Sequence, residues 1–428
     1  MLARTGAELF PHGAQRACGE RNVRAARRRA HEVGARRHAA AATRSVPCSH
    51  DERPPVDEVN ACTGLDRVTV VHPDGTVALR DVTLLARPGE LLAVLGPSGC
   101  GKSTALRAIA GLTKLASGRV LIAGQITTAE PAYRDVAMVF ENTHLVPFMG
   151  VARNMSFGLE SRHVPKDQVR ARVDQQARRL RITRLLGGTP GSISAGERGQ
   201  VGVGRALVRT PKAFLLDEPL AHVDAQERAR MRRVIAETVK QAGVSTVYVT
   251  HDKTDALAIG DRVAVLNACR VAQIGTPREL YDEPADLFVA DFVGAVPMGQ
   301  LEARLVASGG FAGYQVGRRT LTTWAPVPPA LAGHIGREVV LGLRAEDVRD
   351  AATDANPDLA RLSGTVRSIE RNGRDAYVTA QVEGHRVVAR FQGRTAARIG
   401  DMVTVAVDAA RAHVFDASTG RAISHPAR

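Results

Sequence analysis

Residues 96–104 form the pattern that most restricts what this chain can fold into. They fit G-x-x-x-x-G-K-[ST] with no residue left over, as Gly96, Pro97, Ser98, Gly99, Cys100, Gly101, Lys102, Ser103 and Thr104. An apolar run at 91–95 predicts a buried strand before this loop, and apolar residues at helical spacing after it predict a helix. Backbone N–H groups of such a loop close around phosphate oxygens, and the helix N-terminus adds partial positive charge. The stretch therefore predicts a nucleotide site in which Lys102 reaches the β- and γ-phosphates and Ser103 ligates Mg²⁺.

Two later apolar runs end in residues that can carry phosphate chemistry. One leads into Asp217 and Glu218, and the other, at 246–250, leads into His251. The helical composition of residues 226–242 between them predicts strand–helix alternation and a mostly parallel sheet, whose strands deliver their last residues to one edge. One carboxylate is needed to hold Mg²⁺ and another to orient and activate the attacking water. We assign Asp217 to the metal, Glu218 to the water, and His251 to the γ-phosphate and the same water.

Composition restricts the class of protein. With 428 residues, 44% hydrophobic and 24% charged, the chain is long enough for two or three domains of ordinary globular composition. No apolar run reaches about eighteen residues, so none is predicted to span a membrane. The five cysteines form no C-x-x-C pair, which favours a reducing compartment over a disulfide scaffold or a zinc site. Residues 1–50 hold ten arginines and three glutamates, half of the net charge of +14, so we expect no nucleic-acid partner.

Composition also divides the chain into three segments. Residues 1–62, rich in Arg and Ala and without an apolar face even in a possible helix at 22–38, are predicted to be a disordered leader. Residues 63–297 carry the motifs above, and in residues 298–428 short alternating strands predict a small β-barrel-like domain. In the first domain, strands are predicted at 68–70, 77–79, 82–85, 119–124 and 135–140. An amphipathic helix is predicted at 160–182, and a glycine-rich passage at 187–204 leads to a further helix at 206–208. In the second, strands are predicted at 339–343, 364–369, 376–382, 386–391, 402–407 and 413–415.

From residue 66 to about 297 these motifs resemble, in kind and in order, those of the ATP-binding subunit of ABC transporters. Besides the phosphate loop they are the loop with Phe140 and Glu141, the signature Ile193-Ser194-Ala195-Gly196-Glu197, the strand ending at Asp217-Glu218, the loop Ala221-His222-Val223-Asp224, and the switch His251. Residues 154–159 and 275–281 look like the maltose-type sugar-importer branch. The C-terminal β-domain does too, with matching motifs at 341–346 and 413–420, so the resemblance covers about 360 residues.

The resemblance implies an α/β P-loop NTPase domain with a helical subdomain, followed by an all-β OB-like domain of the TOBE type. It implies a homodimer, or a pair with a homologous ATPase subunit, that sandwiches two ATP molecules with Mg²⁺. Ser194 and Gly196 would then contact the γ-phosphate bound by the partner, His72 would take the place of the adenine-stacking aromatic, and Asp224 and Glu141 would complete the nucleotide and metal sites. The segment between Glu141 and residue 204 would transmit motion to integral membrane permease subunits at the cytoplasmic face of the membrane, and a solute-binding protein would act indirectly.

The chain departs from the family pattern at several positions. The family's loop glutamine is Glu141, which adds a negative charge near the phosphates at a cost of about 1–4 kcal/mol. Ala195 and Glu197 replace a glycine and a glutamine of the signature, and glycines behind it at 199, 202 and 204 weaken the following helix by about 1 kcal/mol each unless packing compensates. His222 replaces a small or amide residue, and Cys269 stands in a hairpin where the family favours glycine, so it is strained if that position needs positive φ. These changes are compatible with an active paralogue and with an impaired ATPase that binds ATP but dimerises poorly.

The leading interpretation is the ATPase that energises an importer, for sugars in the first place. Importers of polyamine, iron or an oxyanion remain alternatives, because the same type of β-domain recurs there. A soluble ATP-dependent nucleic-acid protein is the alternative from another class; the chain's single phosphate loop and its lack of sustained heptads argue against it.

Overall fold

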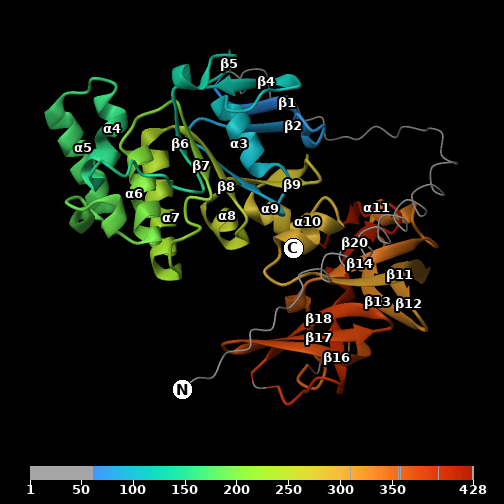
Figure 1. Cartoon of the computed structure of the whole chain (residues 1–428). Coiled ribbons are helices and arrows are strands. Elements are labelled where there is room, and N and C mark those ends of the chain that lie inside the picture. Colours follow the sequence, from blue (N-terminus) through green and yellow to red (C-terminus); the bar gives the residue numbers. More distant parts are fainter. Residues whose placement is uncertain (1–60, 309, 355, 357, 394, 427–428) are drawn as a thin grey trace, which may run out of the picture. The chain divides into compact units, whose positions relative to one another are not determined.

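The computed structural model describes residues 61–308, 310–354, 356, 358–393 and 395–426 (Figure 1). The predicted leader, with its possible helix at 22–38, lies outside the described residues apart from Ala61 and Cys62.

A six-stranded sheet, ordered β10-β9-β3-β8-β7-β6, organises the first domain. Strand β3 pairs in parallel with β8 and β9, and β7 pairs in parallel with β6 and β8, whereas β10 is antiparallel to β9. This confirms the mostly parallel α/β sheet. The strands are β3 (Leu91–Leu95), β6 (Val136–Val139), β7 (Ala213–Asp217), β8 (Ser245–Thr250), β9 (Arg262–Asn267) and β10 (Arg270–Gly275).

Both faces of this sheet are buried, because alternate residues of β3 belong to two different cores. Side chains of α4 (Val151–Glu160), α5 (Lys166–Arg179), α6 (Ala195–Leu207), α7 (Ala225–Ala242) and α8 (Lys253–Ile259) contribute to one core, as do Leu280, Val289 and Val293 further along the chain. The other core holds α3 (Lys102–Ala110) and an antiparallel sheet ordered β2-β1-β4-β5, made of β1 (Thr63–Val71), β2 (Val77–Ala86), β4 (Ser117–Ile122) and β5 (Gln125–Thr127). The helix after the phosphate loop is thus held between two sheets, which fixes its N-terminus at the edge of the parallel sheet.

The helical subdomain differs from the sequence prediction at three helices. The helix predicted at 160–182 is shorter, α5, and it begins after Pro165, whose fixed φ and missing N–H suit a helix start but not an interior. Helix α4, which precedes it, was not predicted. Helix α6 begins at Ala195 inside the glycine-rich passage, because Ser194 and Glu197 form a capping box there. Three short 3₁₀ segments lie nearby, η1 (Pro131–Tyr133), η2 (Thr183–Leu185) and η3 (Pro190–Ser192).

Packing explains two of the three glycines that follow the signature in α6, at 199, 202 and 204. A Cβ on Gly202 would lie 2.2 Å from Thr143 Cγ2, and one on Gly204 would lie 2.9 Å from Met155 Cε. The close approach of these side chains therefore compensates for the low helix propensity of Gly202 and Gly204. A Cβ on Gly199 would meet no described neighbour within 4 Å, so the expected weakening applies there alone.

The C-terminal domain consists of two antiparallel sheets that share one hydrophobic core, which confirms the predicted small β-barrel-like domain. Helices α9 (Pro277–Asp282) and α10 (Leu287–Val293) precede it. One sheet, β13-β12-β11-β14-β20-β21, contains β11 (Gly299–Ser308), β12 (Phe311–Val316), β13 (Arg319–Pro326), β14 (Glu338–Leu343), β20 (His413–Asp416) and β21 (Ala422–Ser424). The other, β15-β19-β16-β17-β18, contains β15 (Val348–Asp350), β16 (Ala360–Asn372), β17 (Asp375–Val382), β18 (His385–Gln392) and β19 (Met402–Val407). The remaining short helices are α11 (Pro329–Ala332), η4 (Ala345–Asp347) and η5 (Ala409–Arg411). Strands β11 to β13 were not predicted.

A buried arginine joins α9 and α10 to this domain. Arg344 donates to the carbonyl oxygens of Tyr281 at 2.8 Å and Ala290 at 2.9 Å, and its guanidinium carbon lies 4.0 Å from the centre of the Tyr281 ring. The Tyr281 hydroxyl in turn donates to Glu346. Arg344 and Glu346 of the sequence motif at 341–346 therefore have a structural role, because they connect the C-terminal domain to α9 and α10.

The hairpin between β9 and β10 provides a stability prediction. Its two-residue loop, Ala268 and Cys269, has φ angles of 45° and 64°, both in the left-handed region. The condition for strain at Cys269 is therefore met, and C269G is expected to raise the free energy of unfolding by about 1 kcal/mol. The measurement is the urea denaturation midpoint. Because the Cys269 thiol also donates to the Val77 carbonyl at 3.1 Å, C269A serves as the matched control that removes the thiol and keeps the strain. A C269G midpoint no higher than that of C269A would contradict the strain argument.

Candidate functional site

The phosphate loop has the backbone that its glycines predict. Gly99 and Gly101 have φ angles of 79° and 102°, and a Cβ on Gly101 would lie 2.3 Å from the carbonyl oxygen of Ala78 in β2. Lys102, the first residue of α3, is buried, and its Nζ donates to the carbonyl oxygens of Gly96 at 2.8 Å and of Pro97 at 2.9 Å. The ammonium group thus lies against the inner side of the loop. Burial raises the pKa of the Cys100 thiol, which disfavours the reactive thiolate form.

Asp217 ends β7 beside this loop and accepts a hydrogen bond from the Ser103 hydroxyl at 3.0 Å. Burial raises the pKa of Asp217; the Ser103 hydrogen bond opposes this rise, whereas the charges of Glu141 and Glu218 add to it. A hydroxyl and a carboxylate at hydrogen-bond distance supply the hard oxygen ligands that Mg²⁺ prefers. The residues present therefore fit a magnesium ion at this position, and a bound cation would relieve the crowding of negative charge.

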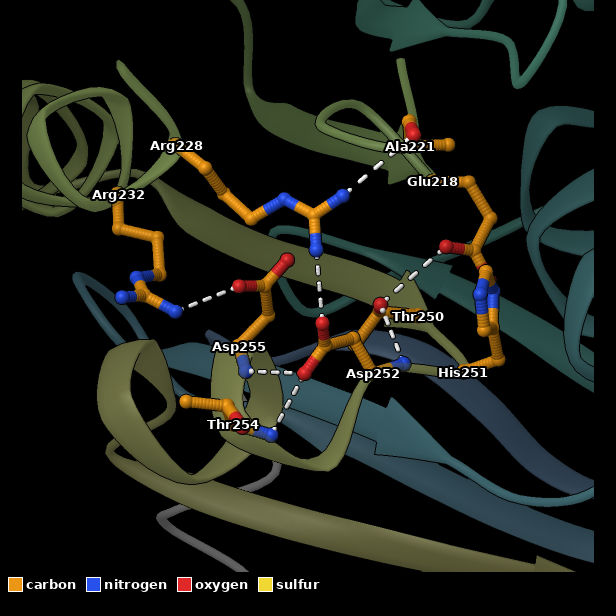
Figure 2. Close-up of polar contacts among 9 residues, drawn as sticks. All are labelled: Glu218, Ala221, Arg228, Arg232, Thr250, His251, Asp252, Thr254 and Asp255. Atoms are coloured by element: carbon orange, nitrogen blue, oxygen red, sulfur yellow. Dashed lines mark hydrogen bonds and ion pairs between the residues drawn. The ribbon is translucent and has the colours of Figure 1, made fainter. Parts of the chain in front are cut away.

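Glu218 turns away from β7 with a φ of 45°, which directs its side chain differently from that of Asp217. Its Oε2 accepts from the Thr250 hydroxyl at 3.2 Å, and its Oε1 lies 2.7 Å from His251 Nδ1. The parallel pairing of β7 with β8 explains these contacts. Asp217 is in register with Val249, so Glu218 comes next to Thr250 and His251. Figure 2 shows Thr250 and His251, from the end of β8, directed toward the Glu218 carboxylate.

Glu141 and Glu218 share a cavity of about 260 Å³. Its other walls come from the loop after Glu141, the start of α6 and the loop after β7, through Asn142, Thr143, His144, Ala195, Arg198, Gly199, Pro219, Ala221 and His222. Glu141 is exposed, and its charge acts on the Asp217 carboxyl as described above. The negative charge that the sequence introduces at this position therefore lies close enough to act on the carboxyl of Asp217.

Three residues of the signature, Ser194, Gly196 and Glu197, line a second cavity of about 600 Å³. Ser194 caps α6, and a Cβ on Gly196 would lie 2.8 Å from the His222 carbonyl oxygen, so the chain requires glycine there. Glu197 accepts from the Ser194 N–H at 2.8 Å and pairs with Arg184 Nη2 at 2.5 Å. The Ser194 N–H and the Arg184 guanidinium both lower the pKa of Glu197, so this carboxylate is charged and locally neutralised.

The remaining predicted residues lie outside the first cavity. Asp224 caps α7 by accepting from the Glu227 N–H at 3.0 Å, and it lines the second cavity with Ser194 and Gly196. His72 is exposed just after β1, in a turn closed by hydrogen bonds to Thr76 and Gly75. Three residues that hold these carboxylates were not predicted from the sequence. Thr250 contacts Glu218, Arg184 contacts Glu197, and Arg228 contacts Asp252. Only Thr250 could have been found from the sequence, because it stands next to His251.

The phosphate loop, the Ser103–Asp217 pair and the Glu218–His251 pair together define a P-loop nucleotide site at the edge of a parallel sheet. Comparison with known proteins narrows the class. Residues 79–221 match the ABC transporter family, and residues 341–415 match the TOBE domain.

Three curated relatives match over nearly their whole length. The trehalose import ATP-binding protein of Mycobacterium tuberculosis is 41% identical, covering 85% of this chain and 98% of the relative. An sn-glycerol-3-phosphate import ATP-binding protein of Agrobacterium fabrum is 39% identical, covering 83% and 98%, and the trehalose/maltose import ATP-binding protein of Thermococcus litoralis is 39% identical, covering 81% and 95%. A solved dimeric bacterial ABC transporter cassette is 25% identical with a TM-score of 0.47, covering 50% of this chain and 98% of that one. The chain therefore belongs to the family of ABC transporter ATP-binding proteins, and it is an ABC-type transporter ATPase with a C-terminal TOBE domain.

The part of the chain that the structure describes contains no helix long and apolar enough to cross a bilayer.

Proposed function

We propose that this chain is the subunit that hydrolyses ATP to drive a carbohydrate importer. The main support is the near full-length similarity to relatives named for the import of trehalose, of maltose and of sn-glycerol-3-phosphate. The solute class proposed is accordingly a sugar or a phosphorylated sugar alcohol. In this proposal, residues 63–297 form the ATPase domain and residues 298–428 form the TOBE-type domain.

Each polar group at the sheet edge has a role in this proposal. The loop 96–104 and Lys102 bind the phosphates of ATP, and Ser103, Asp217 and Glu141 hold Mg²⁺, which offsets charge on the β- and γ-phosphates. Glu218 orients the attacking water and accepts its proton. Because His251 Nδ1 is engaged with Glu218, its Nε2 is the nitrogen left to face the γ-phosphate and the water.

The second cavity is proposed to receive the nucleotide bound by a partner ATPase subunit. Ser194 and Gly196 lie at the N-terminus of a thirteen-residue helix, α6, where backbone N–H groups favour an anion, and Asp224 lines the same cavity. His72 would face the adenine, with less π-surface than a larger aromatic ring offers.

Exposed aromatic side chains support contact with permease subunits at the cytoplasmic face of the membrane. Phe148 is 84% exposed and Phe157 is 46% exposed, and both lie in the segment that follows Glu141. We propose that these two accessible side chains belong to the surface that contacts the permease.

The F148D variant tests this proposal. A charge at the centre of an apolar contact is expected to lower co-purification with the permease by about tenfold, while turnover of the isolated chain stays within about twofold. The matched control is Y133D, since Tyr133 is 81% exposed on η1, outside that segment. Equal loss of assembly with both variants would contradict the assigned surface. Lack of ATP-driven sugar uptake by the reconstituted complex, together with salt-sensitive DNA or RNA binding by the chain, would favour the nucleic-acid alternative instead.

A further inference from the structure

Two ion pairs connect α7 to α8 side by side (Figure 2). Arg228 Nη1 lies 2.8 Å from Asp252 Oδ2, and one helical turn further along α7, Arg232 Nη1 lies 2.6 Å from Asp255 Oδ1. The Asp252 side chain is 29% exposed and that of Asp255 only 3%. The two pairs are of the same chemical type, and by burial the second has the larger structural role.

The first pair is connected to the carboxylate of Glu218 through the end of β8. Asp252 directly follows His251, and its N–H donates to the Thr250 hydroxyl at 3.0 Å. That hydroxyl donates to Glu218 Oε2 at 3.2 Å. The other oxygen of the Asp252 carboxylate accepts from the N–H groups of Thr254 at 2.8 Å and Asp255 at 3.1 Å, which caps α8. Asp252 therefore fixes the end of β8 from which Thr250 and His251 hold Glu218.

Arg228 also reaches the loop on the other side of Glu218. Its Nη2 donates to the Ala221 carbonyl oxygen at 3.4 Å, and the Ala221 N–H donates to the Glu218 carbonyl oxygen at 3.2 Å. The same loop continues into His222, which lines both cavities. One planar guanidinium thus contacts the Asp252 side chain at the end of β8 and the backbone of the loop that follows Glu218.

The contact between Arg228 and Asp252 requires a charged carboxylate at Asp252. Burial would raise the pKa of Asp252, but the N–H groups of Asp255 and Thr254 and the charge of Arg228 lower it, so Asp252 stays ionised and available to this arginine.

We propose that Arg228 is a positioning residue for ATP hydrolysis, which holds Asp252 and the loop at Ala221 so that Thr250 and His251 keep the Glu218 carboxylate directed at the attacking water. The inference rests on the proposed function, in which Glu218 activates that water. Arg228 contacts neither nucleotide nor water in this role.

The test compares R228A with R232A in the full chain, through kcat, KM for Mg-ATP and melting temperature. R228A is expected to lower kcat about tenfold with KM within about twofold, because it loosens the base without touching the phosphate loop. R232A is expected to leave kcat within about twofold, although it lowers the melting temperature at least as much. D252N keeps an oxygen to cap α8, so it is expected to reproduce the R228A loss, and R228A/D252N to be no slower than either single variant.

Several results would overturn the inference. Equal loss of kcat in R228A and R232A would show that both pairs only pack α7 on α8. Additive losses in R228A and D252N would show that they act independently. If the unmodified chain hydrolyses ATP and E218Q abolishes turnover while R228A does not, the inference fails and the proposed function stands. If the unmodified chain has no turnover at all, alone or with its permease, both fail.

Discussion

Replacing Glu218 with glutamine is expected to lower ATP turnover by about 10²–10⁴-fold, the usual range for removing a general base. The amide has nearly the same shape and can still accept the Thr250 hydrogen bond, which is 3.2 Å long in the structure. It cannot take a proton from water. Ser103 and Asp217, which are hydrogen-bonded to each other at 3.0 Å, are unchanged by the substitution, so affinity for Mg-ATP is expected to stay within about threefold.

The measurement is steady-state phosphate release together with equilibrium binding of Mg-ATP. E237Q is the matched control, because Glu237 is an exposed carboxylate on α7 and outside both cavities. Turnover of E218Q within tenfold of the unmodified chain would exclude Glu218 as the base. Loss of nucleotide binding in parallel with turnover would instead assign its carboxylate to the binding site.

The sheet edge could be predicted from the sequence because each of its polar residues ends a recognisable apolar run. Parallel topology then brings Asp217 and His251 to the phosphate loop, and the register of β7 on β8 and of β3 on β8 confirms that meeting. Arg228 and Asp252 carried no such signal. They are 24 residues apart, on two helices whose relative rotation depends on how both pack on the sheet.

The elements that were missed have weak local signals that tertiary packing overrides. Helix α4 contains Gly158 and Asn154, both poor helix formers, yet Val151, Met155 and Leu159 are buried against the core. The Asn154 side chain is used outside the helix, since it accepts from the Val146 N–H at 2.7 Å and donates to the Met149 carbonyl oxygen at 2.9 Å. Strands β12 and β13 are joined by a turn at Gly317, which has positive φ, and the polar composition of β13 hides its alternation.

Glu197 illustrates a departure from the family pattern that the structure accounts for. From the sequence alone it was an unexplained charge in the signature. In the fold, its carboxylate completes the cap of α6 and pairs with Arg184, so its charge is balanced within the same chain. No comparable cation contacts Glu141 among the described ion pairs. Burial is the main cause of the raised pKa of Asp217, the Ser103 hydrogen bond opposes it, and the charge of Glu141 raises the pKa further. The two substitutions, similar in the sequence, are therefore expected to differ in their effect on turnover.

The E141Q variant is accordingly expected to raise turnover at saturating Mg-ATP. Two like charges about 4 Å apart repel by about 1 kcal/mol in water and about 4 kcal/mol at the dielectric of a protein surface. Because Glu141 is exposed, the lower value applies, which corresponds to about fivefold in rate if the repulsion grows as negative charge develops at the γ-phosphate.

Glutamine keeps an oxygen for the metal and removes only the charge, so kcat rather than affinity is expected to change. Salt provides an independent check, because screening weakens the repulsion only in the unmodified chain. The ratio of E141Q to unmodified turnover should therefore fall as ionic strength rises. E302Q, which removes an exposed carboxylate from β11 in the C-terminal domain, is the matched control and should leave turnover unchanged at every salt concentration. Turnover of E141Q equal to or below that of the unmodified chain would contradict the charge argument and show that the carboxylate, not the amide, is the form this site requires.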